Sequence, residues 1–210
     1  DRWILSSLNS LVKRVKYELD NYDPTRAGRL IDSFVNDDLS NWYVRLNRRR
    51  FWGGGMTQDK LSAYQTLYIC LETVSKLMAP ISPFYADRLF TDLITVTGRD
   101  KAESVHLSDF PRCNEAMIDK TLEEQMQIAQ DISSMVLALR RKVNIKVRQP
   151  LQTIMVPVTD IWQKQHIEAV KNLILSEVNV KELNFADNSA GILVKKIKPD
   201  FKKLGPRYGK

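Results

Sequence analysis

The stretch 1-DRWILSSLNSLVKRVKYELDNYDP-24 decides the fold, because it shows a helical pattern, its end and the start of a second helix. Its apolar residues recur every three or four positions, the spacing of an amphipathic helix with one buried face. They are Trp3, Ile4, Leu8, Leu11, Val12, Val15 and Leu19. The polar run NYD interrupts this pattern, Asp23 is suited to cap a helix, and Pro24 is suited to its first turn. The sequence therefore predicts a first helix that starts at Arg2 and ends near NYDP, and a second that starts at Pro24.

The second predicted helix is about 28 residues long and ends at the three glycines 53–55, which favour a helix stop and a flexible loop. At about 100° per residue its apolar residues form one stripe along the helix. This stripe consists of Val35, Leu39, Trp42, Tyr43 and Leu46. The flank beside it consists of Asn41, Arg45, Arg48 and Trp52, with Arg49 between flank and stripe. One helix end is thus predicted to carry core residues and cations side by side.

Three more helices follow in the same pattern. The third begins after Thr57, which suits an N-cap, and ends at the break APISP. Ser82 and Pro83 open the fourth, which gives way to the polar turn TGRDKAES. The fifth runs from about Ala116 into the basic run RRKVNIKVRQP. Five helices with short connectors predict a bundle, so the fold class is mainly α.

The pattern changes after Pro150. The run LQTIMVPV favours a strand, DIWQKQHIEAVKNLILSEVN a helix, and VKELNFA and ILVKKI two strands around the turn DNSAG. The sequence therefore predicts two domains: a helical bundle at 1–148 and a small α/β subdomain at 149–210, which we expect to be truncated at Lys210.

Composition limits the classes of partner and site that the chain can have. The chain has 32 Lys and Arg against 25 Asp and Glu, a net charge of +7 that favours a polyanionic partner but also serves solubility. Cys70 and Cys113 lie far apart, which argues against a disulfide framework, and His106 and His166 lack neighbours with metal-ligand spacing, so no metal site is expected. No run approaches the roughly 18 apolar residues of a membrane span, and we expect a cytoplasmic protein.

Catalytic motifs are absent from the sequence. FWGGGMTQDK lacks the Lys followed by Ser or Thr that a phosphate-binding loop needs after its glycines. No nucleophile elbow and no Ser, His and acid constellation can be assembled. We expect no catalytic residue in this stretch of chain.

Two basic clusters end helices and are candidate RNA-binding surfaces. In the first, guanidinium groups can grip phosphate or base edges, and Phe51 or Trp52 can offer a platform for stacking an unpaired base. The second consists of Arg140, Arg141, Lys142, Lys146 and Arg148. A solvated face with cations at the negative end of a helix dipole explains either cluster equally well.

Several motifs resemble the anticodon-binding region of class I isoleucyl-tRNA synthetases, and the resemblance covers nearly the whole chain. They are DRWILSSLNSLV, FVNDDLSNWYVRLNRRRFW, LYICLETVSKLMAPISPFYADRLF, SVHLSDFP, KVRQPL and LSEVNVKEL. LMAPISPF and the bundle are shared in outline with the valyl, leucyl and methionyl enzymes. LSNWYVRLNRRRFW, SVHL, VRQPL and NVKEL are similar to the isoleucyl branch.

The resemblance implies a five-helix anticodon-binding bundle that binds an isoleucine-specific tRNA, in a monomeric parent enzyme that ligates isoleucine to that tRNA with ATP and Mg²⁺. Neither ATP-binding signature of the class is present, so the catalytic core, the editing site and their cofactors are expected elsewhere in the parent chain. The resemblance and the helix-end positions together predict the RNA-binding residues Asn41, Arg45, Arg48, Arg49, Phe51, Trp52, Arg140, Arg141, Lys142 and Arg148. The alternatives are a free-standing, non-enzymatic module that binds RNA or protein, and the same region of a valyl, leucyl or methionyl enzyme.

Overall fold

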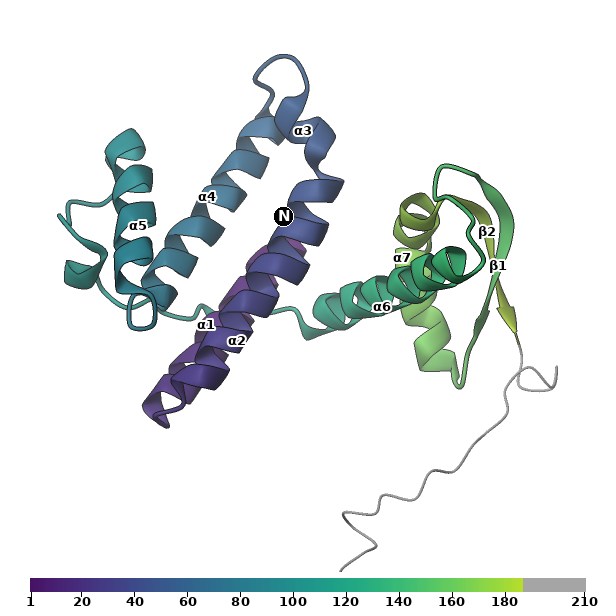
Figure 1. Ribbon diagram of the computed structural model, residues 1–210, viewed down its shortest axis with the longest axis horizontal. Helices are drawn as coiled ribbons and strands as arrows, with labels where there is room; N and C mark the ends of the chain where they lie inside the picture. The colour runs from purple at the N-terminus through teal and green to yellow at the C-terminus, as the bar shows by residue number, and fades with distance from the viewer. Residues whose placement is uncertain (187–210) are drawn as a thin grey trace, which may run out of the picture. The chain divides into compact units, whose positions relative to one another are not determined.

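The computed structural model describes residues 1–186 and forms two compact units, the first from Asp1 to Glu123 and the second from Glu124 (Figure 1). The described residues are mostly helical, and their one sheet has two strands. The predicted mainly α class with a small α/β part is confirmed. The division falls within α6 (Lys120–Lys142), the fifth predicted helix. The predicted domain limit at 148/149 stays a prediction.

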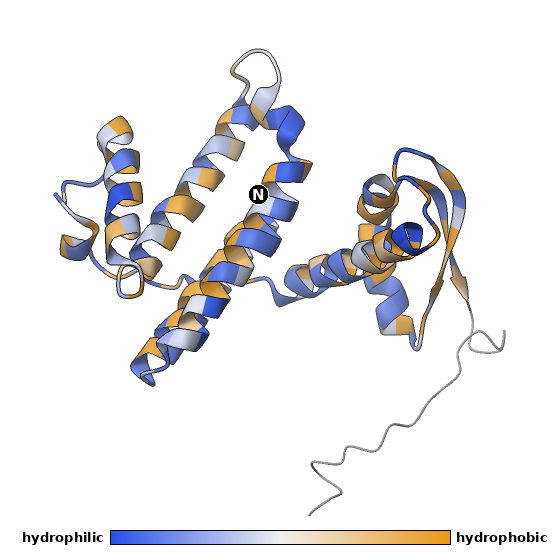
Figure 2. Cartoon of the chain, viewed as in Figure 1, coloured by the Kyte–Doolittle hydropathy of each residue, from blue (hydrophilic) through white to orange (hydrophobic). Residues whose placement is uncertain are grey.

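The first unit is built from helices that bury one apolar face each. They are α1 (Arg2–Asp20), α2 (Pro24–Ser33), α4 (Gln58–Met78) and α5 (Pro83–Thr97), with the short turns η2 (Val105–Leu107) and η3 (Glu115–Met117). Figure 2 shows apolar and polar residues alternating around these helices. Most of the predicted α1 stripe is buried, and Trp3 and Leu19 are half-buried against the same core. Because α2 and α4 add Ala27, Ile31, Cys70, Val74 and Leu77, the core lies among these three helices.

The prediction of one regular helix from Pro24 to the glycines is wrong in its middle. After α2 the backbone widens into the π-helical segment η1 (Phe34–Val44), where the Arg45 amide donates to the Ser40 carbonyl five residues back. A turn at Asn47 then separates η1 from α3 (Arg48–Trp52). A π turn takes more residues than an α turn, so a stripe drawn at about 100° per residue slips. Leu39, Trp42 and Tyr43 are buried as predicted, whereas Leu46 is exposed.

The second unit contains a parallel pair of strands joined by a helix. Strand β1 (Leu151–Pro157) pairs with β2 (Val180–Ala186) from Leu151↔Val180 to Pro157↔Ala186, and α7 (Ile161–Val178) connects them. Asp160 caps α7 by accepting from the Gln163 amide at 2.7 Å. The buried residues of the strands and α7 include Val156, Ile167, Val170, Ile174 and Leu183. The predicted strand ILVKKI lies outside the described residues.

A hydrogen-bonded clasp joins α1 to the start of α6 within the first unit. The hydroxyls of Ser6 and Ser10 donate to Glu123 Oε1 at 2.6 and 2.7 Å, and Lys120 Nζ donates to Oε2 at 2.8 Å. Ser6 also accepts from the Asp119 amide at 2.8 Å. Burial alone would raise the pKa of Glu123, but these three donors outweigh burial and lower it.

Replacement of Glu123 by Gln tests this clasp. A carboxyl whose pKa is lower in the folded state stabilises the fold above its unfolded pKa of about 4.3, and the stabilisation is lost as the pH falls through the folded pKa. We expect Glu123→Gln to lower the free energy of unfolding at pH 7 by about 1 to 3 kcal/mol and to have little effect well below pH 4. Urea unfolding followed by tryptophan fluorescence at several pH values measures this. An equal loss at every pH would contradict the assignment, and the exposed Glu124→Gln is the control.

Candidate RNA interface

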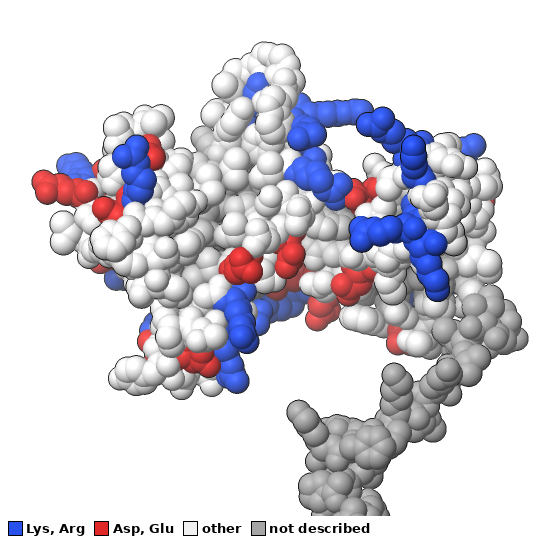
Figure 3. Space-filling model, viewed as in Figure 1, with Lys and Arg blue, Asp and Glu red and all other residues white. Residues whose placement is uncertain are grey.

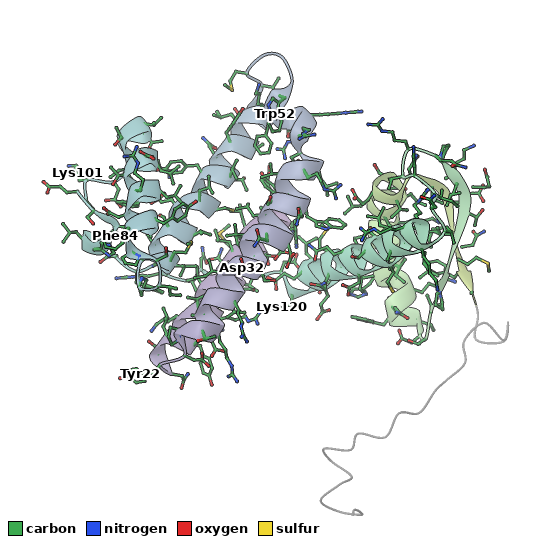
Figure 4. The ribbon with its side chains drawn as sticks, viewed as in Figure 1. Tyr22, Asp32, Trp52, Phe84, Lys101 and Lys120 are labelled. Atoms are coloured by element: carbon green, nitrogen blue, oxygen red, sulfur yellow. The ribbon has the colours of Figure 1, made fainter. Side chains whose placement is uncertain are left out.

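The helix α3 presents cations and an aromatic ring to solvent. Arg48 and Arg49 are exposed. Trp52 is 69% exposed at the end of the helix, beside the glycine loop (Figure 4). The Arg48 guanidinium carbon lies 5.5 Å from the centroid of the Trp52 ring, within cation–π range. The indole of Trp52 is thus held beside a cation and remains open to a ligand.

Arg50 has a different role from its two neighbours. Its guanidinium donates to both Asp1 carboxylate oxygens at 2.9 Å, to Asp59 Oδ2 at 2.8 Å and to the Asp59 carbonyl at 3.0 Å. It also donates to Asn47 Oδ1 at 3.0 Å, at the turn before α3. Arg50 therefore fixes α3 against the beginnings of α1 and α4.

The glycine loop is fastened at its first residue. A Cβ on Gly53 would lie 2.7 Å from the Arg49 carbonyl oxygen, closer than real contacts allow. The Gly53 amide donates to that carbonyl at 2.9 Å, and Lys60 Nζ donates to the Gly53 carbonyl at 2.7 Å. These contacts end α3 directly after Trp52 and leave that end of the helix exposed.

The structure contradicts the prediction that Phe51 is an RNA-stacking platform. Phe51 is 6% exposed and packs edge-on against Tyr43 and Tyr64, with ring centroids 6.2 and 5.3 Å away. The Tyr64 hydroxyl donates to the Phe51 carbonyl at 3.0 Å. The change of period in η1 and the turn at Asn47 rotate Phe51 inward, where its ring contacts that of Trp52 edge-on, with the centroids 6.3 Å apart.

Asn41 and Arg45 lie on η1, before α3, and both are exposed. Arg45 Nε donates to the Asn41 carbonyl at 2.7 Å, so the arginine lies back along the helix. The structure therefore places five of the six residues predicted in this cluster at the surface. They are Asn41, Arg45, Arg48, Arg49 and Trp52. Their binding of RNA stays a prediction.

The second predicted cluster lies in the second unit. Arg141, Lys142 and Arg148 are exposed, as a phosphate contact requires. Arg140 is 3% exposed, and its guanidinium donates only to backbone carbonyls, so the prediction that it contacts RNA is wrong. Figure 3 shows Lys and Arg side chains gathered on this unit over the end of α6 and the loop that follows it.

Sequence reasoning missed the anchoring roles of Arg50 and Lys60. The partners of Arg50 include Asp1, which is 49 residues away in sequence, and nothing in RRR itself distinguishes its last position from the two before it. Within the described residues, no group of three His, Cys, Asp or Glu side chains is arranged to hold a metal. In the same part of the chain, no helix is long and apolar enough to cross a membrane.

Exposed arginines beside an open tryptophan, on an anchored helix end, define a candidate RNA-binding helical domain. Residues 1–155 match the family model described as the anticodon-binding domain of tRNA ligase, and the chain belongs to this family. It is similar over all 210 residues to three isoleucine–tRNA ligases, at 74% identity in Bacteroides fragilis, 68% in Porphyromonas gingivalis and 40% in Clostridium novyi. The chain spans 18%, 18% and 20% of these relatives, about a fifth of their length.

The division of RRR into one anchor and two exposed cations gives a stability test. We expect Arg50→Met to lower the free energy of unfolding by about 1 to 3 kcal/mol, because it leaves two carboxylates without their partner. The matched variant Arg48→Met removes an exposed cation and its contact with Trp52, and should cost about 0.5 kcal/mol or less. Urea unfolding of both variants measures the difference. Equal losses would show that Arg50 is no anchor.

Proposed function

We propose that this chain is the anticodon-binding segment of an isoleucine–tRNA ligase and that it binds the anticodon stem and loop of an isoleucine tRNA. Family membership and the similarity to named isoleucine–tRNA ligases support this proposal. The structural observation that carries it is the open indole of Trp52, held beside Arg48 on a helix that Arg50 anchors.

Each exposed residue of the first cluster has a chemical role in this proposal. Anticodon bases are unpaired, so one of them can stack on the Trp52 indole, with the Arg48 guanidinium alongside. Arg45 and Arg49 can grip phosphates or base edges, since a guanidinium presents donors in a planar fork. The Asn41 side-chain amide offers both a donor and an acceptor to a base edge. Base identity would then be read by Asn41 and the arginines, and binding strength would come from stacking and charge.

The exposed cations of the second cluster, Arg141, Lys142 and Arg148, are proposed to contact the RNA backbone. Phosphate contacts set position and register, whereas base contacts carry sequence information. The two clusters therefore have different roles in this proposal. The first recognises unpaired bases, and the second adds affinity that depends on salt.

The whole protein is proposed to ligate isoleucine to its tRNA, to use ATP and Mg²⁺ and to act as a monomer in the cytoplasm. ATP, Mg²⁺ and the editing of mischarged amino acids belong to parts of the parent enzyme outside this chain, and we assign no residue here to them. We further propose that 1–148 is the anticodon-binding domain and 149–210 the start of a C-terminal subdomain. The tRNA anticodon and the catalytic core of the parent are then the partners of this segment.

Substitution of Trp52 tests the stacking role. Base stacking on an aromatic side chain contributes about 1 to 3 kcal/mol, so Trp52→Ala should weaken binding of the isoleucine anticodon hairpin by about 5- to 150-fold. Trp52→Phe should keep most of the affinity, and Arg48→Ala should show a smaller loss than Trp52→Ala. Fluorescence anisotropy with a labelled RNA hairpin measures these affinities. Arg88→Ala is the control, because Arg88 is an exposed cation on α5, paired with Asp92.

A hairpin with a changed anticodon separates recognition from simple charge attraction. The unchanged chain should bind it at least about tenfold more weakly, since unpaired bases are read by specific contacts. Equal binding of both hairpins, with affinity that depends only on salt, would instead favour a general RNA-binding module. Preference for a valine, leucine or methionine anticodon would assign the chain to another ligase.

A further inference from the structure

We propose that Arg140 is a positioning residue, which holds loop 143–150 against the end of α7 and so fixes four exposed cations as one phosphate-binding array. The array consists of Arg141, Lys142, Lys146 and Arg148. The RNA nature of the ligand rests on the proposed function, whereas the fastening of the loop by Arg140 does not.

The guanidinium of Arg140 joins two segments that are distant in sequence. Nη1 donates to the carbonyls of Lys146 at 3.3 Å and Gln149 at 3.0 Å, both in the loop. Nη2 donates to the carbonyls of Val178 at 2.8 Å and Asn179 at 3.0 Å, at the end of α7. The last carbonyls of a helix carry partial negative charge, which partly compensates a buried cation. Arg140 therefore serves as a cap for α7 and as the fastening of the loop.

Further contacts fix the same loop. The Ile145 amide donates to the Arg140 carbonyl at 2.9 Å, and the Leu151 amide donates to the Asn179 carbonyl at 3.2 Å. Asn179 Nδ2 donates to the Val147 carbonyl at 2.9 Å. The carbonyls of residues 146, 147 and 149 are thus all held from inside the unit.

The exposed cations are attached to this fastened backbone. The backbone of Lys146 accepts from Arg140 directly, and Arg148 lies between the held carbonyls of Val147 and Gln149. Arg141 and Lys142 precede the loop on the last turn of α6. All four of these residues are exposed. Four exposed cations on an ordered backbone suit successive phosphates of an RNA strand.

A buried arginine can strengthen RNA binding by ordering the loop that carries exposed cations before the RNA binds. A mobile loop must lose conformational freedom when it binds, and that loss subtracts from affinity. Because Arg140 orders the loop in the free protein, its removal should weaken RNA binding although it touches no RNA. This effect distinguishes a positioning residue from a contact residue.

The test compares loop order with RNA affinity in the 210-residue chain. We expect Arg140→Met to speed amide hydrogen exchange at Ile145, Gln149 and Leu151 without RNA, and to weaken binding of an RNA hairpin by about tenfold or more. The slope of log affinity against log salt should fall by about 1 to 2, the equivalent of one or two lost phosphate contacts. Arg140→Lys keeps the charge but lacks the planar fork, so it should show an intermediate loss in both measurements.

Two matched variants keep the test decisive if Arg140→Met does not fold. Asn179 has a φ of 52°, which Gly adopts without strain, so Asn179→Gly removes only the side-chain bond to the Val147 carbonyl. It should loosen the loop and weaken RNA binding by a few-fold, although no cation is changed. Arg141→Met removes one exposed cation and should weaken binding while leaving loop exchange unchanged.

The proposal requires RNA affinity to fall as amide hydrogen exchange in the loop speeds up, across Arg140→Met, Arg140→Lys and Asn179→Gly. In any of these three variants, faster exchange with unchanged affinity, or weaker binding with unchanged exchange, would overturn it. Losses should be equal for the isoleucine hairpin and the hairpin with a changed anticodon, because phosphates carry no sequence. If the unchanged chain binds both hairpins equally, the anticodon proposal fails while the role of Arg140 stands. If it binds no RNA at all, both fail.

Discussion

The structure of the candidate interface depends on the bidentate contact between Arg50 and the Asp1 carboxylate. This contact, with the bonds to Asp59, joins α3 to the beginnings of α1 and α4. Without it a helix of five residues would have little to hold its direction, because short helices are marginal by themselves. The exposure of Arg48, Arg49 and Trp52 follows from that direction.

The two basic clusters share one principle. In each, an arginine is withdrawn from the surface and bound to oxygen atoms of the protein, while neighbours in sequence remain exposed. Arg50 is bound mainly by carboxylates and Arg140 by four backbone carbonyls. Arginine suits both tasks, because its planar donors can satisfy several acceptors at once and its charge persists at any working pH. A basic run in a sequence therefore contains both ligand-binding cations and the cations that position them.

Local patterns in the sequence predict most of the helices and their caps. Asp23 accepts from the Arg26 amide at 2.9 Å and Thr57 from the Lys60 amide at 3.2 Å, as their places before helical runs indicate. These features need only neighbours within a turn, so local spacing reveals them. The positions of Phe51 and Arg140 depend on η1 and on the end of α7, respectively. No local pattern carries that information, and an amphipathic stripe drawn with one period misplaced Leu46.

The glycine loop contains a position for a spectroscopic probe beside the exposed face of Trp52. Gly53 has no room for a Cβ and Gly55 has a φ of 71°, whereas Gly54 has open space around it and no such backbone requirement. Gly54 is therefore the position at which the loop tolerates a side chain, two residues from the indole of Trp52. A cysteine placed there would carry a fluorescent dye close enough to that indole to exchange excitation energy with it. A dye at residue 54 would thus report the binding of a ligand to the exposed face of Trp52.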